Sequence, residues 1–145
     1  MSALETALAA QWAMVPSSLE TLLSVADRTN TVTPEVLEAY RAAHADRGER
    51  LRIRDGVAIL DVSGPLFKKA NLFVHISGAT SYEMLMRDLH VALDDPAVNS
   101  IMLRLDSPGG EANGCDELAA AIYAARGKKP ITAFVSGQAC SGGYW

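Results

Sequence analysis

Two apolar runs in the second half of the chain each lead into a cluster of glycine and other small residues. The run Ile131–Val135 is β-branched and aromatic, which predicts a buried strand, and Gly137–Gly143 follows it. The run Ser100–Leu105 predicts a second strand, and Asp106–Gly110 follows that one. Because the carboxyl ends of strands in an open α/β sheet meet at one edge, we expect the two turns to lie side by side.

Helical periodicity separates these strands. Thr80–Glu83 has the pattern of a capping box, and the apolar stripe after it predicts a helix that ends at Asp94–Pro96. A second helix is predicted between Gly110 and Gly127. The order strand, helix, strand, helix, strand predicts right-handed βαβ units, a mostly parallel sheet and therefore an α/β fold.

A hairpin is predicted in front of these units. Leu51–Arg54 alternates with a period of two residues, Asp55-Gly56 is a typical two-residue turn, and Val57–Val62 continues as a strand. The segment 67–78 after it shows no period and is expected to form a loop.

The first fifty residues differ from the rest. Apolar positions from Trp12 to Leu23 are spaced as in a helix and are interrupted by Pro16, which predicts a helix pair. Thr33-Pro34-Glu35 predicts the start of another helix. The polar run 46–50 is the best boundary, so we expect an N-terminal helical segment over 1–50 and a second unit over 51–145.

Composition adds exclusions more than assignments. The chain has 145 residues, 49% of them hydrophobic, and a net charge of −4, which gives no indication of nucleic-acid binding. Two cysteines without metal-ligand spacing, Cys115 and Cys140, indicate a reducing, cytoplasmic setting and no metal. The N-terminus lacks the features of a signal peptide, and no apolar run is long enough to predict a membrane anchor.

Ser141 is the candidate nucleophile. It lies among small residues directly after a predicted strand, where a backbone turn can expose its hydroxyl. Gly109-Gly110 leaves backbone N–H groups uncovered by side chains, as an oxyanion hole requires. Cys140 is an alternative nucleophile, but a small buried hydrophobic role is the more common one for such a cysteine. Asp106 is expected to hold its turn.

Together, Asp106-Ser107-Pro108-Gly109-Gly110 and Ala139-Cys140-Ser141-Gly142-Gly143-Tyr144 resemble the signature of the SppA-type signal peptide peptidases, within the Clp protease/crotonase fold. The resemblance runs from about Gly56 to the chain end. Ile76–Tyr82 resembles the phage branch of the family, the capsid-maturation proteases. The implied fold consists of repeated ββα and βαβ units preceded by an N-terminal helical segment.

The resemblance implies that Ser141 is the nucleophile and that the N–H groups of Gly110 and Gly142 form the oxyanion hole. It also implies a Ser–Lys dyad, whose lysine lies some tens of residues after the serine. The sequence ends four residues after Ser141, so that lysine is absent from it and the C-terminal part of the fold is expected to be missing. Lys68 or Lys69 could only be a substitute base, and His90 has no catalytic partner spaced to hold it.

Three functions remain open. The first is a serine endopeptidase of the capsid-maturation type, which cleaves scaffold or coat proteins in the host cytoplasm or the phage prohead, needs no cofactor and forms homo-oligomers. The second is a crotonase-like acyl-CoA enzyme, which uses paired N–H groups without a nucleophilic serine. The third is a non-catalytic, truncated assembly module. Whichever function is correct, this exact polypeptide is expected to be poorly active as an isolated protein.

Overall fold

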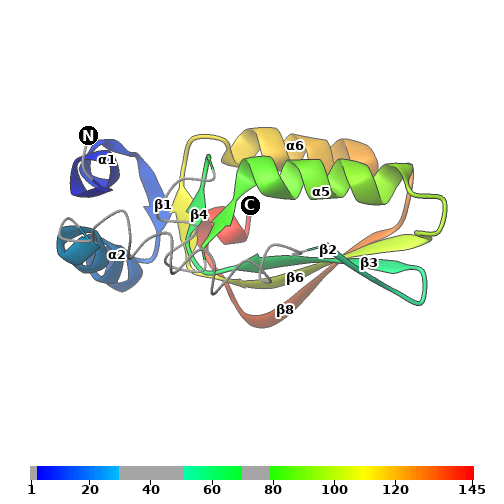
Figure 1. The fold of residues 1–145 in the computed structure, drawn as a ribbon, viewed down its shortest axis with the longest axis horizontal. Coiled ribbons are helices and arrows are strands. Elements are labelled where there is room, and N and C mark those ends of the chain that lie inside the picture. The colour runs from blue at the N-terminus through cyan, green and yellow to red at the C-terminus, as the bar shows by residue number, and fades with distance from the viewer. Residues whose placement is uncertain (1–2, 30–50, 70–78) are drawn as a thin grey trace.

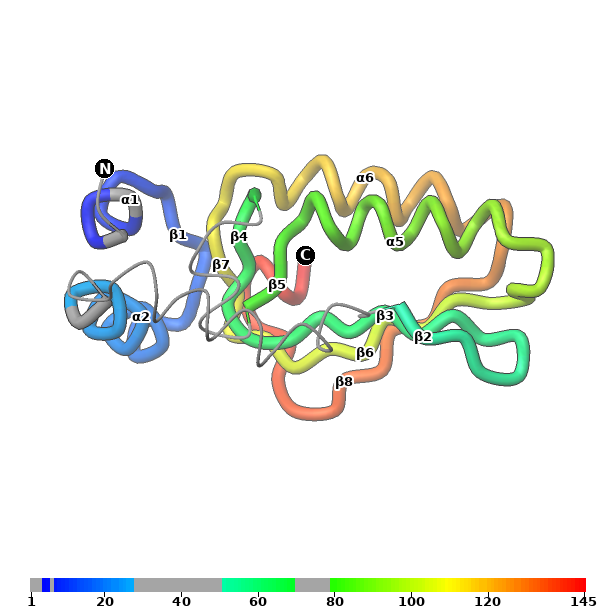
Figure 2. Tube along the Cα trace, viewed as in Figure 1, coloured from blue at the N-terminus to red at the C-terminus, as the bar shows by residue number. Residues whose placement is uncertain are grey.

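The computed structural model describes residues 3–29, 51–69 and 79–145. These residues form an α/β structure with two mixed, mostly parallel sheets. Figure 1 shows the layers and Figure 2 the path of the backbone. The elements in chain order are α1 (Ala3–Ala9), β1 (Trp12–Met14), α2 (Pro16–Thr29), β2 (Leu51–Arg54), β3 (Val57–Ser63), β4 (Leu66–Phe67), β5 (Thr80–Ser81), α5 (Tyr82–Asp94), β6 (Ser100–Ser107), β7 (Gly109–Glu111), α6 (Cys115–Ala125), β8 (Ile131–Ala139) and the 3₁₀ turn η2 (Ser141–Gly143).

The larger sheet has the strand order β2-β3-β6-β8, in which β3, β6 and β8 are parallel. Helices α5 and α6 lie next to each other over one face of this sheet (Figure 1). Each parallel pair is connected through one of these helices, as the sequence predicts. The predicted parallel βαβ arrangement is therefore confirmed.

The predicted hairpin is also confirmed. Strand β2 pairs antiparallel with β3, and Arg54 is directly opposite Val57. Both turn residues have positive φ, 50° at Asp55 and 78° at Gly56, as a two-residue type I′ turn requires. This turn fixes the register that directs alternate residues of β3 toward the helices.

The main core lies between the sheet and the two helices. Alternate residues of β3 and β6 are buried against α5 and α6 because side chains along a strand point to opposite faces. The buried members of this core include Ala58, Leu60, Val62, Leu85, Leu89, Ile101, Leu103 and Leu118. Strand β6 ends in one of the two glycine-rich turns, so this core fixes the position of that turn.

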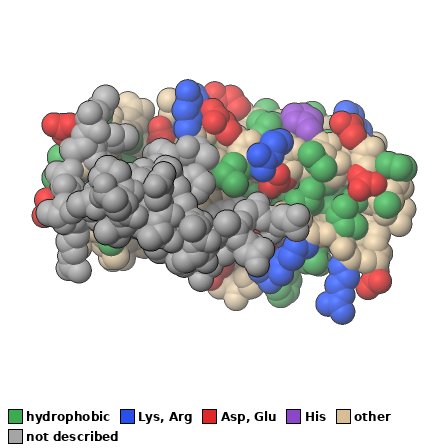
Figure 3. Space-filling view, viewed as in Figure 1, with side chains coloured by type: hydrophobic (Ala, Val, Ile, Leu, Met, Phe, Trp, Pro, Cys, Tyr) green, Lys and Arg blue, Asp and Glu red, His purple; other side chains and the backbone are tan. Residues whose placement is uncertain are grey.

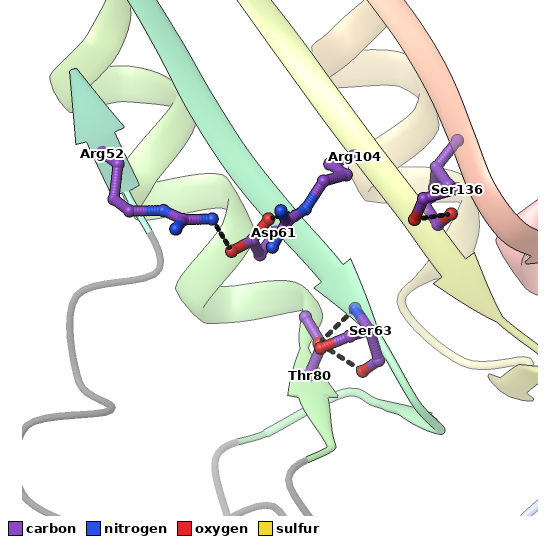
Figure 4. A network of polar contacts seen from close by, with 7 residues as sticks. Arg52, Asp61, Ser63, Thr80, Arg104 and Ser136 are labelled. Carbon is purple, nitrogen blue, oxygen red and sulfur yellow. Dashed lines mark hydrogen bonds and ion pairs between the residues drawn. The ribbon is translucent and has the colours of Figure 1, made fainter. Parts of the chain in front are cut away.

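The opposite face of the sheet carries an ion-pair network (Figure 4). The Asp61 carboxylate accepts from Arg52 Nη2 at 2.6 Å, and its other oxygen lies 2.6 Å from Arg104 Nε. Near the end of β3, the Thr80 hydroxyl donates to the Ser63 carbonyl at 2.7 Å and accepts from the Ser63 N–H at 3.1 Å. These bonds join the larger sheet to β5 of the smaller one.

The smaller sheet has the strand order β1-β7-β4-β5 and lies at the carboxyl ends of β3 and β6 (Figure 2). Helices α1 and α2 lie beyond β1, at the N-terminal end of the molecule (Figure 1). Their apolar faces form a second cluster with Phe67, which includes Ala7, Leu22 and Ala26. The helix pair on either side of Pro16 is as predicted, but the strand between the two helices is not.

Helix α5 begins one residue later than the capping box predicts. Its N-cap is Ser81, whose hydroxyl accepts from the Met84 N–H at 3.1 Å, whereas Thr80 bonds Ser63 instead. The local pattern suits either hydroxyl, and the tertiary contact of Thr80 decides between them. At the other end, Lys129 Nζ donates to the Ala92 and Asp95 carbonyls at 2.8 and 2.7 Å, which satisfies carbonyls at the helix C-terminus.

The prediction that Ile131–Val135 is buried is wrong. This segment does form a strand, but β8 is at the edge of the sheet, and Phe134 and Val135 are 52% and 51% exposed. An apolar run alone cannot distinguish an edge strand from a central one.

Two further predictions concern parts of the chain outside the described residues: the helix that starts at Thr33-Pro34 and most of the loop at 67–78. On the face in Figure 3, acidic and basic side chains intermix over the described surface. None of the described helices has both the length and the apolar character of a membrane span.

Candidate active site

The two glycine-rich turns meet at one end of the larger sheet. Ser107, at the end of β6, pairs with Ala139, at the end of β8. The Cys140 N–H donates to the Ser107 carbonyl at 3.1 Å, and β7 contacts η2. The side-by-side arrangement that the sequence predicts is therefore present.

Ser141 begins η2 and is exposed. Its φ is 49°, in the left-handed region that residues with a side chain rarely adopt. A serine in this conformation directly after a strand is a feature of nucleophiles that a sharp turn presents to substrate. The element that Ser141 begins is a single 3₁₀ turn of three residues.

Gly142, the next residue, supplies an available backbone donor. Within the part of the chain that the structure describes, its N–H donates no hydrogen bond, whereas the Gly143 N–H donates to the Cys140 carbonyl at 2.8 Å. Gly142 is also buried. A buried N–H without an acceptor can bind an oxygen that develops negative charge.

Gly109 and Gly110 form the other side of the site, in β7. Gly109 has a φ of 99°, and a methyl group on it would overlap the Ala13 carbonyl oxygen of β1. A methyl group on Gly110 would overlap the Leu66 carbonyl oxygen of β4. Glycine is therefore required at both positions, because neighbouring backbone fills the space that a side chain would need.

Ser107 holds this turn in place. Its fully buried hydroxyl donates to the Gly64 carbonyl at 2.8 Å and accepts from the Gly109 N–H at 3.2 Å. No role for Ser107 is predicted from the sequence. A hydroxyl two residues before a glycine in a turn is the signal that could have indicated one.

Asp106 has the turn-holding position that the sequence analysis expects. Its carboxylate accepts from the Gln138 N–H at 3.2 Å, where the register of β6 and β8 is irregular. Figure 1 shows β8 bending away from β6 in this region. The carboxylate fills that bend, since even a methyl group on Gly137 would overlap it.

Tyr82 and Cys115 support η2 from the helix side. The Tyr82 hydroxyl donates to the Glu111 carbonyl at 2.8 Å, and the Cys115 thiol lies 3.4 Å from the Gly142 carbonyl, to which it donates. Burial raises the pKa of the Tyr82 hydroxyl far above its usual value, and the neighbouring Cys115 adds to the rise. Burial likewise raises the pKa of the Cys115 thiol, against a smaller lowering by the Tyr82 hydrogen bond. Helical periodicity predicts the helix that Tyr82 begins but gives no signal for this contact with η2.

The two cysteines are expected to differ in reactivity. Cys140 is only partly buried, contrary to the expectation of a buried residue, whereas Cys115 is 4% exposed. Because the thiolate is the reactive form, iodoacetamide at pH 8 should alkylate Cys140 first and Cys115 only after unfolding. Mass spectrometry of the native and urea-unfolded chain measures this difference. Equal alkylation of both thiols in the native chain would contradict it.

The raised pKa of Cys115 also sets a pH dependence of stability. The unfolded thiol ionises near its ordinary pKa of 9.0, while the folded thiol still holds its proton. The contribution of the Cys115 thiol to the free energy of unfolding is therefore complete below that pH. It is lost as the pH rises through the folded-state pKa of the thiol. In urea unfolding between pH 7 and 10, Cys115→Ala should reduce the loss of stability, and Cys140→Ala is the matched control.

An apolar cavity of about 240 Å³ lies between the sheet, the two helices and the C-terminal turn. Gly142 and Gly143 form part of its wall, and Leu60, Leu103 and Leu118 form much of the rest. It is wide enough for one apolar side chain of a bound peptide.

No described lysine contacts Ser141. Lys68 Nζ donates to Asn113 Oδ1 at 2.9 Å and lies 3.7 Å from Glu117, and Lys129 bonds the end of α5. Lys69 and His90 are exposed. Among the described residues, no cluster of side chains could hold a metal ion.

Comparison with known proteins reveals clear relatives, although no protein-family model matches the chain. The chain is 37% identical over 104 residues to the head-tail preconnector protein GP5 of Enterobacteria phage P21, an alignment that covers 72% of this chain and 21% of that protein. It is 31% identical over 131 residues to capsid assembly protease C of Escherichia phage lambda, and this alignment covers 83% of this chain and 30% of that protein. It is 33% identical over 90 residues to protease 4 of Salmonella typhi, and this alignment covers 61% of this chain and 14% of that protein. The chain thus spans less than a third of the length of each of these relatives.

Proposed function

The chain is homologous to the SppA/protease 4 family and to the phage capsid assembly protease, and on this premise we propose that it carries the nucleophile and oxyanion hole of a serine peptidase. The observation that supports the proposal most is Ser141 itself. It is an exposed serine in a left-handed turn, followed by a buried glycine N–H without an acceptor among the described residues. The homology also supports a Clp protease/crotonase fold, built on residues 51–145 after a helical segment over 1–50.

The proposed reaction is acyl transfer through Ser141. The hydroxyl attacks the carbonyl carbon of the substrate peptide while a base removes its proton, and the N–H groups of Gly110 and Gly142 bind the oxyanion. The peptide C–N bond then breaks, the base returns the proton to the leaving amine, and water hydrolyses the acyl-enzyme. We assign the base to a lysine outside these 145 residues, since the described lysines are bonded elsewhere or exposed.

The proposed substrates are proteins of phage head assembly. Two relatives are a capsid assembly protease and a head-tail preconnector protein, which supports scaffold or coat proteins as substrates in the host cytoplasm or prohead. That the protein acts as a homo-oligomer is a further part of the proposal and rests on the family resemblance alone. The apolar cavity beside Gly142 would receive an apolar side chain of the substrate.

A fluorophosphonate probe tests the proposal, because it reacts covalently with activated serines. We expect it to label Ser141 in the protein expressed from the complete reading frame that contains these 145 codons. The 145-residue chain alone should be labelled weakly, because none of its described lysines contacts Ser141. Peptide mapping by mass spectrometry locates the label. Absence of the label from Ser141 in the complete product would contradict the proposal and favour a non-catalytic assembly module.

A further inference from the structure

Strand β1 lies against the candidate oxyanion hole. It pairs antiparallel with β7, so that Ala13 is opposite Gly110 and Met14 is opposite Gly109. Strand β1 also contacts η2, which contains Ser141. Figure 2 shows β1 between the N-terminal helices and β7, with the C-terminal turn close by.

The hydrogen-bond pattern directs Ala13 toward Gly110. On either side of this pair, the Ala112 N–H donates to the Gln11 carbonyl at 2.7 Å and the Val15 N–H to the Pro108 carbonyl at 3.0 Å. Hydrogen-bonded pairs alternate along an antiparallel ladder. The Ala13–Gly110 pair is therefore of the hydrogen-bonded kind, and the Ala13 carbonyl faces the Gly110 N–H.

The Ala13 carbonyl oxygen is also near the second proposed oxyanion donor. A methyl group on Gly142 would lie 3.4 Å from this oxygen, and one on Gly109 would overlap it. One carbonyl of the N-terminal segment thus lies among the glycines to which the oxyanion hole is assigned. A peptide carbonyl has this position when its bond is presented to the nucleophile.

We propose that β1 occupies the substrate groove of the Ser141 site, and that substrate peptides bind by replacing it as a strand antiparallel to β7. The inference rests on the proposed function for the identity of the groove. Addition of a strand to a sheet edge is a common mode of peptide recognition, in which main-chain hydrogen bonds give affinity. The Ala13–Met14 bond has the place of the scissile bond.

Among the described residues, β1 is held by its ladder to β7 and by the packing of Trp12 and Met14 on the second apolar cluster. The Trp12 indole N–H donates to the Ala7 carbonyl at 2.8 Å, and its ring makes an edge contact with Phe67 at 5.6 Å between centroids. Strand β1 is three residues long and is at the edge of its sheet. A short strand at the edge of a sheet can be exchanged for another strand of similar sequence.

Binding of a short peptide tests the exchange. The probe is a fluorescein-labelled peptide with the sequence of residues 10–16, measured by fluorescence anisotropy against the 145-residue chain. Ala13→Pro removes an N–H that faces β7 and should release β1 from the groove. Met14→Pro is the matched control, because the Met14 N–H is at a non-hydrogen-bonded position of the same edge strand.

We expect the peptide to bind Ala13→Pro at least about tenfold more tightly than the wild type, because a tethered strand competes at an effective concentration of about a millimolar. Met14→Pro should bind like the wild type. Equal affinity of the wild type and a folded Ala13→Pro chain would overturn the proposal. Circular dichroism checks the fold.

If Ala13→Pro does not fold, hydrogen exchange of the wild-type chain tests whether the peptide replaces β1. Saturating peptide should accelerate amide exchange in residues 11–15, and unchanged exchange would overturn the proposal. Peptide binding does not require a reactive serine, so this result is separate from fluorophosphonate labelling. If the peptide binds Ala13→Pro more tightly but Ser141 is not labelled, the exchange of β1 is supported and the peptidase proposal fails. If Ser141 is labelled but peptide binding and hydrogen exchange are unchanged, the peptidase proposal is supported and the exchange of β1 fails.

Discussion

Replacing Ser141 by alanine should abolish peptide hydrolysis by the complete protein, with a loss of at least about 10³-fold in kcat/KM. The alanine retains the backbone donors but removes the oxygen that forms the acyl-enzyme. Cleavage of a quenched fluorescent peptide measures the loss. Affinity for the substrate-like peptide should change little, because β7 and the glycine N–H groups are retained.

Ser136→Ala is the matched control for this experiment. Ser136 is an exposed serine of β8, and its hydroxyl donates to the Leu105 carbonyl at 3.2 Å (Figure 4). Its replacement should leave hydrolysis within about twofold of the wild type, since surface substitutions rarely change the fold. Full activity of Ser141→Ala would show that another group is the nucleophile.

Replacing Gly110 by alanine should both destabilise the chain and remove serine labelling. The new methyl group would overlap the Leu66 carbonyl, and neither backbone can move without breaking the pairing of β7 with β4 or β1. Overpacking of this kind costs about 1–3 kcal/mol of unfolding free energy. Urea unfolding of the 145-residue chain measures the cost, and fluorophosphonate labelling of the complete protein measures the effect on the site.

Gly127→Ala is the control for the chemical change. A methyl group at Gly127 meets no atom within 4 Å, and the residue does not have the left-handed backbone of Gly109. Its replacement should leave the free energy of unfolding unchanged or raise it by up to about 1 kcal/mol, because alanine restricts the unfolded chain. Equal effects at Gly110 and Gly127 would mean that β7 and β4 are not closely packed.

The parts of the fold that the sequence predicts are those with a local signal. Asp55-Gly56 defines a turn by itself. The two-residue period of β2, the apolar run of β6 and the helical period of α5 mark these elements within a few residues. The glycine-rich turns were placed together because both follow parallel strands. Each of these inferences uses only neighbours along the chain.

The parts that the sequence does not predict depend on distant contacts. Strand β1 has three residues, too few for an alternating pattern, and its partner lies 99 positions away, from Trp12 to Glu111. Whether β8 is central or at an edge depends on what lies beyond it, which no local pattern reports. The choice of Ser81 over Thr80 as N-cap likewise follows from the bond between Thr80 and Ser63.

The pairing of β1 with β7 has a consequence for the order of events during synthesis. Ribosomes add about 5–20 residues per second, so the Trp12–Met14 segment leaves the ribosome several seconds before Gly109–Glu111 does. The segment that fills the groove is therefore present before the groove can form. If β1 fills the substrate groove as proposed, a nascent chain would hold the groove closed from the moment that it forms.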